Sequence, residues 1–270
     1  MKDPKISEDY IRINRDSWNK RTERHFESLF YDNASFLEGR SSLNDIELSL
    51  LGDITGKKIL HLQCHFGQDS ISLARLGAQV TGVDLSGNAI EKARALSKAA
   101  GTSCRFIESD IYELPAKLDE QFDIVFTSYG TIGWLPDINK WAGVVERFTK
   151  KNGWIIMAEF HPFVWMFDDD FKTISYRYFN DKPIIESEEG SYTENSKSDT
   201  YASVTWNHGL AEVLQALVDR EFDLEVIREY DYSPYNCFKG TVEVKKGKYR
   251  IEKLGDRIPM VYALKMCKST

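Results

Sequence analysis

Two carboxylates stand where two short apolar stretches end, and their positions suit a nucleoside. Asp84 closes residues 79–84, and Asp110 follows residues 104–107. A carboxylate at the end of a parallel strand can accept both hydroxyls of a ribose. Asp110 is suited to accept a hydrogen bond from an adenine amino group, with Ile111 packing beside the ring. The pair favours an adenosine ligand, and the alternative for each carboxylate is an ordinary turn.

The loop after the first apolar stretch restricts which nucleotide could bind. Its sequence contains one glycine, Gly67, with Gln63 and His65 where small residues would be wanted. A dinucleotide site needs glycines so that the pyrophosphate can approach the backbone. The loop therefore disfavours NAD and favours a single nucleoside with an amino-acid tail. His61 and His65 also flank Cys64, but side chains on a strand and its loop do not converge as metal ligands do, so no metal is expected.

Alternating strands and helices must position these residues. Continuous or alternating apolar residues predict five strands, at residues 58–62, 79–84, 104–107, 122–127 and 154–159. Helical spacing of apolar residues predicts helices in three of the four segments between them. This alternation is typical of a parallel sheet that helices cover on both faces.

Polar residues near the ends of these helices predict where they begin and stop. Asp69 is expected to cap a helix that begins at Ser70. Further helices are expected over residues 88–100 and 137–150, and Asn152-Gly153 is expected to end the second of them.

Residues 160–206 interrupt this pattern, because they are rich in aromatic and acidic residues. Strand-like alternation at 175–179 and 201–206 predicts an inserted, β-rich cap. Asn207 is expected to cap an amphipathic helix that follows the insertion. Two closing strands are predicted at 222–232 and 260–267. The segment between those strands is expected to form a hairpin that turns at Lys246-Gly247.

The composition excludes several classes of protein. The chain has 270 residues, a formal net charge of −7 and no Lys/Arg block, so nucleic acid is a poor electrostatic partner. No apolar run approaches the ~18 residues that span a bilayer, and the first residues lack the apolar core of a signal peptide. Four scattered cysteines suggest neither a disulfide framework nor a zinc site. We expect a cytoplasmic protein without a membrane partner.

The chain resembles the class I S-adenosylmethionine-dependent methyltransferases. The resemblance lies in the sequence 59–67 for the cofactor loop, Val83-Asp84 for the ribose acid, Ser109-Asp110-Ile111 for the adenine site, and the later motifs 122–126 and 151–154. It covers residues 58–160 well and the last 50 residues by the order of elements. The combination is specific, although each motif alone is weak.

The loop departs from the usual family pattern, acidic-x-Gly-x-Gly-x-Gly. Those positions hold His61, Gln63, His65 and Gly67, and the chain looks like a bacterial branch with a Leu-Gln-Cys-His loop. Because His61 replaces the acid, another group must recognise the methionine ammonium. Nearby backbone carbonyls and a residue of the amino-terminal helix are the candidates.

The resemblance implies an α/β, Rossmann-like fold with a seven-stranded, mostly parallel sheet and an antiparallel closing strand. Amino-terminal helices and the β-rich cap complete this single methyltransferase domain. Its expected parts are an amino-terminal helical segment (1–57), a cofactor-binding core (58–160), the substrate cap (161–206) and the closing helix and strands (207–270).

The expected cofactor is S-adenosylmethionine. The residues expected to bind it are Trp18, Gln63, Cys64, His65, Gly67, Asp84, Leu85, Ser86, Asp110, Ile111 and Ser128. Methyl transfer mainly requires alignment of the acceptor and exclusion of water, and a base is needed only if the acceptor arrives protonated. The candidate catalytic residues are Tyr129, His161 and His208, and the candidate substrate contacts are Glu159, Tyr235 and Asn236.

We therefore expect a methyltransferase that acts on a small-molecule acceptor. The aromatic residues of the cap would suit a planar or cationic acceptor, or would instead form the interface of a homo-oligomer. The alternative from another class is a non-catalytic protein that binds S-adenosylmethionine as a sensor or partner subunit. An NAD-dependent oxidoreductase is disfavoured by the single glycine of the loop.

Overall fold

A seven-stranded sheet forms the centre of the computed structural model, which describes residues 9–180, 182–196 and 198–269. The strand order is β3-β2-β1-β4-β5-β11-β8. Neighbouring strands are parallel except that β11 runs antiparallel to both β5 and β8. The strands are β1 (Lys58–Leu62), β2 (Gln79–Asp84), β3 (Arg105–Glu108), β4 (Phe122–Ser128), β5 (Thr149–Phe160), β8 (Phe222–Tyr230) and β11 (Val261–Lys268). The predicted α/β fold with a mostly parallel sheet is confirmed.

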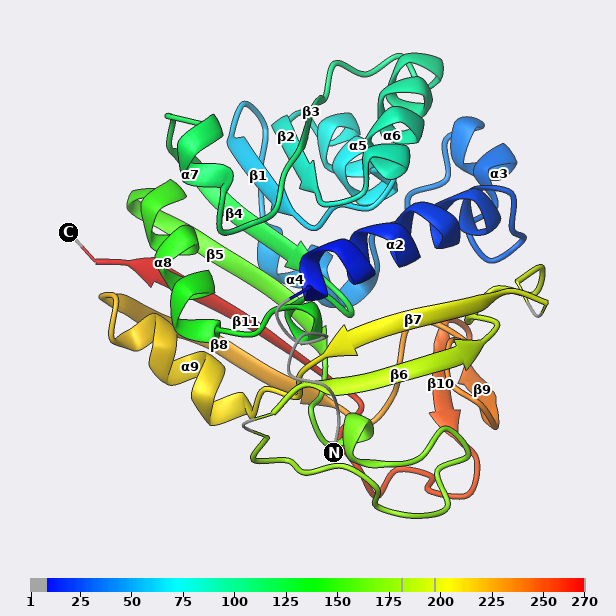
Figure 1. Cartoon of the computed structure of the whole chain (residues 1–270). Helices are drawn as coiled ribbons and strands as arrows, with labels where there is room; N and C mark the ends of the chain where they lie inside the picture. The colour runs from blue at the N-terminus through cyan, green and yellow to red at the C-terminus, as the bar shows by residue number, and fades with distance from the viewer. Residues whose placement is uncertain (1–8, 181, 197, 270) are drawn as a thin grey trace.

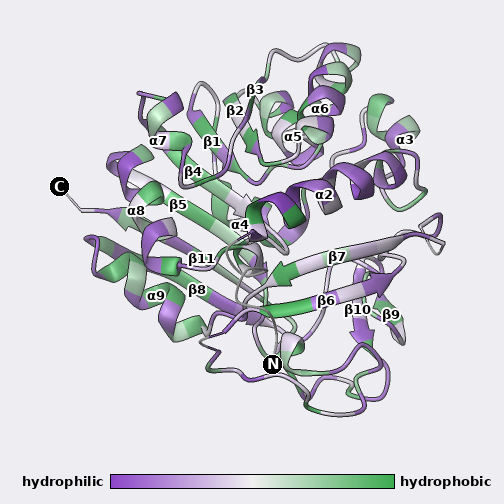
Figure 2. Ribbon diagram, viewed as in Figure 1, coloured by the Kyte–Doolittle hydropathy of each residue, from purple (hydrophilic) through white to green (hydrophobic). Residues whose placement is uncertain are grey.

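Helices cover both faces of this sheet, as the alternating pattern predicted (Figure 1). On one face, Trp141 and Phe148 of α8 and Leu217 of α9 pack on buried strand residues such as Val125 and Leu264. On the other face, helices α4 and α5 pack on β1, β4 and β5. Figure 2 shows the central strands as the hydrophobic layer of the molecule. The helices are α4 (Asp45–Leu51), α5 (Gln68–Arg75), α6 (Gly87–Ala99), α7 (Leu114–Lys117), α8 (Ile138–Phe148) and α9 (Leu210–Val218).

The amino-terminal segment is helical, and its long helix α2 (Tyr10–Phe26) lies beside the inserted hairpin (Figure 1). A short helix, α3 (Asn33–Leu37), follows it. The buried Asn14 joins α2 to the hairpin, because its amide donates to the Val204 carbonyl (2.8 Å) and accepts from the Val204 amide (2.9 Å). Figure 2 shows α2 as mostly hydrophilic, which agrees with a helix held by polar contacts as well as by packing.

The insertion contains an antiparallel hairpin of β6 (Ile184–Glu189) and β7 (Thr200–Thr205). The predicted strand at 201–206 therefore exists, displaced by one residue. The strand predicted at 175–179 is wrong, because these residues form no strand and β6 supplies the partner of β7 instead. Two short 3-10 helices complete the fold: η1 (Ile132–Trp134) follows β4, and η2 (Val164–Met166) lies near the start of the insertion.

Three predicted helix boundaries are wrong, and at two of them the expected capping side chain has a long-range partner instead. Gly67, not Asp69, caps α5, since both Asp69 oxygens accept from serine hydroxyls of other segments. Gly209 precedes α9, and Asn207 donates instead to the Pro162 and Arg177 carbonyls. Helix α8 ends at Phe148, and β5 already includes Asn152-Gly153.

The closing segment is as predicted. Strands β9 (Thr241–Lys245) and β10 (Lys248–Ile251) form a hairpin that turns at Lys246-Gly247. All four cysteines lie in the described part of the chain and are free thiols. Among the described residues, no helix is both long enough and apolar enough to cross a membrane.

Candidate active site

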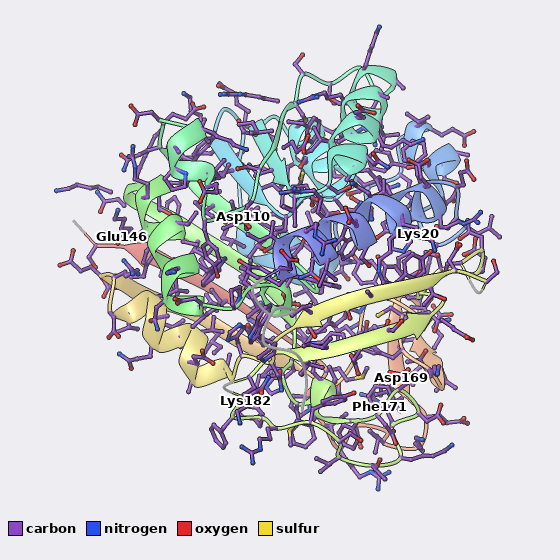
Figure 3. All side chains as sticks on the ribbon, in the orientation of Figure 1. Lys20, Asp110, Glu146, Asp169, Phe171 and Lys182 are labelled. Carbon is purple, nitrogen blue, oxygen red and sulfur yellow. The ribbon has the colours of Figure 1, made fainter. Side chains whose placement is uncertain are left out.

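A cavity of about 1100 Å³ opens at the carboxyl ends of the parallel strands. The loops after β1, β2, β3 and β4 form its floor, and α2, the insertion, Tyr235 and residues 237–239 form its walls. Figure 3 labels Asp110 beside the sheet, and Asp169 and Phe171 far from it in the loops beneath β6. All three residues line the cavity, which therefore extends from the sheet to the insertion.

The loop after β1 adopts left-handed backbone at alternate positions. Gln63, His65 and Gly67 have φ values of 54°, 51° and 80°. Glycine is the usual residue for such backbone, but the Gln63 amide stabilises the turn by donating to the Thr131 carbonyl (2.8 Å). At Gly67 no side chain fits, since a Cβ there would lie 2.8 Å from the Phe106 ring. The loop thus keeps the shape of a glycine-rich turn with two larger residues in it.

Asp84 lies at the end of β2 with both carboxylate oxygens directed by backbone donors. Oδ2 accepts from the His65 amide (2.8 Å) and Oδ1 from the Ser86 amide (2.9 Å). Burial raises the pKa of Asp84 to about 6. Each oxygen accepts one backbone donor and retains a lone pair. A diol in the cavity could therefore donate both its hydroxyls to this residue.

The adenine end expected from the sequence lies on the same cavity. Asp110, Ile111 and Leu85 all line it. One oxygen of Asp110 accepts from the Tyr112 amide (2.8 Å), and burial raises the pKa of this carboxyl. Ile111 is 4 % exposed and belongs to the core beneath.

Two tryptophans cover the β1 loop from above. Trp18 of α2 lies edge-on to the Trp134 ring, with 5.2 Å between centroids, and to the His65 ring, at 5.3 Å. Trp18 was among the expected residues, whereas the sequence analysis missed Trp134. Its signal was present, because Trp134 follows the β4 strand end within six residues.

Tyr129, the residue after β4, is held in left-handed backbone with a φ of 44°. Its hydroxyl donates to Glu47 Oε2 at 2.7 Å. Glu47 is fully buried in α4, and burial, followed by the charge of Asp69, raises its pKa to about 7. The sequence analysis missed Glu47, which lies in a helix more than 80 residues before Tyr129 and carries no local motif.

Several other expected residues have different roles from those predicted. The buried Glu159 lines the cavity, but its carboxylate accepts from the Thr131 and Ile132 amides and from the Gly130 amide, which fixes the loop after β4. This bonding leaves it little capacity for a substrate. Ser86 is buried behind the cavity, where it caps α6 by accepting from the Ala89 amide.

Besides Ser86, two further expected residues do not line the cavity. His161 accepts from the Phe163 amide at Nδ1, and its Nε2 lies 2.9 Å from Glu229 Oε1. Asn236 lies on the exposed surface and accepts from the Thr241 hydroxyl. The strand-end positions were correct, but neither side chain points into the crevice.

His208 and Tyr235 do line the cavity. Both ring nitrogens of His208 are engaged, Nε2 with the Leu135 carbonyl (2.8 Å) and Nδ1 with Glu212 Oε1 (3.1 Å), so neither is free to contact an acceptor. Tyr235 accepts through its hydroxyl from the Asn44 amide (2.9 Å). Of the three candidate catalytic residues, Tyr129 alone reaches the cavity with a hydroxyl bonded to a proton acceptor.

The residues present fit a polar nucleoside with a charged tail. Two buried polar atoms of the β1 loop, Gln63 Oε1 and His65 Nδ1, have no hydrogen-bond partner among the described residues. Buried polar groups normally have partners, so these atoms indicate a ligand or water at the loop. Cys64 also lines the cavity, but burial raises its pKa well above the ordinary value and keeps it an unreactive thiol.

Residues 59–153 match the family model described as a methyltransferase domain. An uncharacterised protein of Haemophilus influenzae is 28% identical over 207 residues, which cover 70% of this chain and 78% of the relative. The ubiquinone biosynthesis O-methyltransferase of Paraburkholderia phymatum is 30% identical over 119 residues, or 43% of this chain. The chain spans about half the length of this and similar curated O-methyltransferases.

Two solved structures share the fold at low sequence identity. The S-adenosylmethionine-dependent methyltransferase of Mesorhizobium loti superposes with a TM-score of 0.55 at 17% identity, covering 86% of this chain and 99% of the other. The magnesium protoporphyrin IX methyltransferase of Synechocystis PCC 6803, solved with bound SAH, gives 0.56 at 15% identity and covers 97% and 100%. The chain therefore matches a methyltransferase domain over residues 59–153, and its strand order and its superposition on these structures show that it shares the fold of S-adenosylmethionine-dependent methyltransferases.

Proposed function

We propose that this chain transfers a methyl group from S-adenosylmethionine to a small-molecule acceptor bound in the same cavity. One observation carries the proposal. Asp84 and Asp110, at the ends of adjacent strands, line the cavity together with the β1 loop. This is the crevice in which an open α/β sheet binds its ligand. The family match and the relatives named as O-methyltransferases support it.

Named residues would hold the cofactor along the edge of the sheet. When bound, S-adenosylmethionine supplies a methyl group activated by a positively charged sulfur. Asp84 would accept from the ribose hydroxyls, and Asp110 from the adenine amino group. Leu85 and Ile111 would pack beside the base, and Trp18 would exclude water from above.

The far end of the cavity is aromatic and would hold the acceptor. Phe160, Trp165 and Phe238 form a cluster with ring centroids 5.1–5.8 Å apart, and all three line the cavity. Asp169 lies at the nearby rim. Aromatic faces with an acidic rim favour a planar or cationic molecule over an anionic one.

Tyr129 and Glu47 would take the proton of an acceptor that must lose one. The Tyr129 hydroxyl oxygen accepts the acceptor's proton while its own proton moves to Glu47 Oε2, over the 2.7 Å hydrogen bond between them. A carboxyl with a pKa of about 7 is matched to this task near neutral pH. Tyr129 gains the acceptor's proton and loses its own to Glu47, so the phenol is unchanged at the end and Glu47 is protonated.

Calorimetric titration with S-adenosylmethionine, S-adenosylhomocysteine and NAD tests the cofactor site, with Asp84→Ala as the paired variant. We expect micromolar binding of both sulfur nucleosides, no binding of NAD, and loss of binding in the variant. Absence of binding to either sulfur nucleoside would refute the proposal. A metabolite-pool assay for S-adenosylhomocysteine release then separates an enzyme from a sensor, since only an enzyme consumes the methyl donor.

A further inference from the structure

Asp69 is a cavity-lining carboxylate with no cationic partner. It lies in the first turn of α5, where Oδ1 accepts from the Ser42 hydroxyl (2.6 Å) and Oδ2 from the Ser128 hydroxyl (2.8 Å). Ser42 and Ser128 line the cavity too. Within the described ranges, no Lys, Arg or His forms an ion pair with Asp69. Each of its oxygens therefore has capacity for one more donor.

The negative charge of Asp69 acts on other acidic groups close to it. Its charge helps to raise the pKa of Glu47 and those of Tyr129 and Tyr235. His61 is the nearby candidate for a positive charge, but burial lowers its pKa to about 4, so it is neutral at pH 7. A carboxylate that is partly desolvated without a counter-charge is costly, which makes this part of the cavity attractive to a cation.

The strand order places Asp69 at one end of a row of ligand-binding positions. Asp110 follows β3, and Asp84 is the last residue of β2. Gln63 follows β1, and Ser128 is the last residue of β4. These four strands are consecutive in the sheet. At about 4.8 Å per strand the row spans roughly 14 Å. A nucleoside bound at Asp110 and Asp84 therefore directs any substituent on its ribose 5′ side across the β1 loop toward Ser128 and Asp69.

We propose that Asp69 binds the α-ammonium group of the methionine tail of the cofactor, in place of an acid at position 61. The inference rests on the proposed function. An ammonium group has three donors. Asp69 provides one acceptor, and Gln63 Oε1, buried and without a partner, provides a second, because Gln63 Nε2 is already directed to the Thr131 carbonyl.

Three ligands separate this role from its alternatives. S-adenosylmethionine has a sulfonium and an ammonium group, and S-adenosylhomocysteine has only the ammonium group. 5′-Methylthioadenosine has the nucleoside and a neutral sulfur but no amino-acid tail. Each is titrated calorimetrically into the full-length wild-type protein, Asp69→Asn and the control Asp119→Asn. Asp119 carries the same functional group outside the cavity, with its side chain 91% exposed.

We expect Asp69→Asn to raise the Kd for S-adenosylmethionine and for S-adenosylhomocysteine by at least about tenfold, since a charge-assisted hydrogen bond is lost. Its affinity for 5′-methylthioadenosine should stay within about twofold of wild type, which also shows that the variant is folded. Asp119→Asn should bind all three ligands as the wild type does.

Other outcomes overturn the inference. Weakening of S-adenosylmethionine alone would show that Asp69 faces the sulfonium. Equal weakening of the binding of all three ligands would show that Asp69 only shapes the loop. If the binding of none of them weakened, Asp69 would not contact the cofactor, and its charge would instead be available to bind a cationic acceptor. If the wild type binds none of the three nucleosides, the proposed function itself fails, a result distinct from a change confined to Asp69→Asn.

Discussion

Glu47 is a fully buried carboxyl group, and its burial makes the free energy of unfolding depend on pH. Its Oε1 accepts from the Asn44 amide in a capping box, and its Oε2 accepts from the Tyr129 hydroxyl. Burial raises its pKa from the ordinary 4.5 to about 7. Because the folded state holds the proton more tightly than the unfolded state, this group's contribution to stability is present below about pH 4.5 and is lost as the pH rises to about 7.

Glu47→Gln removes this group's contribution to the pH dependence of stability. The glutamine side chain can still accept from Asn44 at the start of α4 and provide a hydrogen-bond partner for the Tyr129 hydroxyl. Relative to wild type, the free energy of unfolding of the variant should rise by on the order of 3 kcal/mol between pH 4 and pH 8. Urea denaturation of both proteins across this range measures the difference. Parallel curves for the two proteins would show that Glu47 titrates at its ordinary pKa.

Tyr129→Phe tests the proton relay at the level of one hydroxyl. The ring and its packing remain, but the group that joins the cavity to Glu47 is lost. For an acceptor that must lose a proton, we expect turnover to fall by about 10²-fold, with S-adenosylhomocysteine affinity within about twofold of wild type. Release of S-adenosylhomocysteine with the acceptor found in the metabolite screen measures turnover. Unchanged turnover at all pH values would exclude Tyr129 from proton transfer.

At the scale of elements, helix α2 and the inserted hairpin depend on each other through Asn14. The Asn14 side chain, 2 % exposed, both donates to and accepts from the Val204 backbone. Asn14→Ala leaves two buried backbone groups of β7 without partners, at a cost of about 2 kcal/mol.

We expect the loss in Asn14→Ala to be local, because α2 and β7 form one wall of the cavity and not the centre of the sheet. Hydrogen exchange should accelerate at residues 200–205 and stay unchanged at residues 122–128. Arg12→Ala is the control, since Arg12 of the same helix makes only an exposed pair with Asp9. Exchange in β7 that is equal in the two variants would show that Asn14 does not join these elements.

The elements that the sequence predicted well are those whose neighbours are also close in sequence. The buried strand at 122–127 has a continuous apolar pattern, and its helices pack on it through ordinary βαβ connections. Residues 175–179 have an equally good alternating pattern but no strand partner, because β7 pairs with β6. Strand pairing inside an insertion depends on contacts that no local pattern records.

The same difference between local patterns and long-range contacts applies to the candidate site. That Asp84 and Asp110 lie on one cavity could be predicted, because strand ends of a parallel sheet meet at one edge. Glu47 and Asp69 could not, since their roles come from Tyr129 and from Ser42 and Ser128, which the fold brings from distant segments. His161 had the correct position on a strand end, but the direction of its side chain depends on the partner Glu229 in β8.

At the scale of the whole molecule, the cavity joins two parts of different chemistry. The sheet edge provides carboxylates and backbone groups, and the insertion provides aromatic rings. Asp110 and Phe171 mark these two ends in Figure 3. If the cofactor and the acceptor occupy separate ends, substitutions at one end should alter one binding event and spare the other.

Trp165→Ala tests this division at the aromatic end. Trp165 lines the cavity in η2, contacts the rings of Phe160 and Phe238, and is 42% exposed, so its removal leaves no large void in the core. Loss of one aromatic contact should raise the KM for a planar or cationic acceptor by about two- to tenfold. S-adenosylhomocysteine affinity should not change, whereas Asp84→Ala should abolish it.

Trp154→Ala is the matched control, because its ring packs under Lys265 on β11 and does not line the cavity. We expect it to leave both KM and nucleoside affinity at wild-type values. If Trp165→Ala weakened S-adenosylhomocysteine as much as the acceptor, the two ligands would share one end of the cavity. If Trp165→Ala changed neither the KM for the acceptor nor the affinity for S-adenosylhomocysteine, the aromatic wall would not bind either ligand. The exposed Trp165 ring would then belong to an interface between copies of the chain. Sedimentation of the wild type and of Trp165→Ala measures that association.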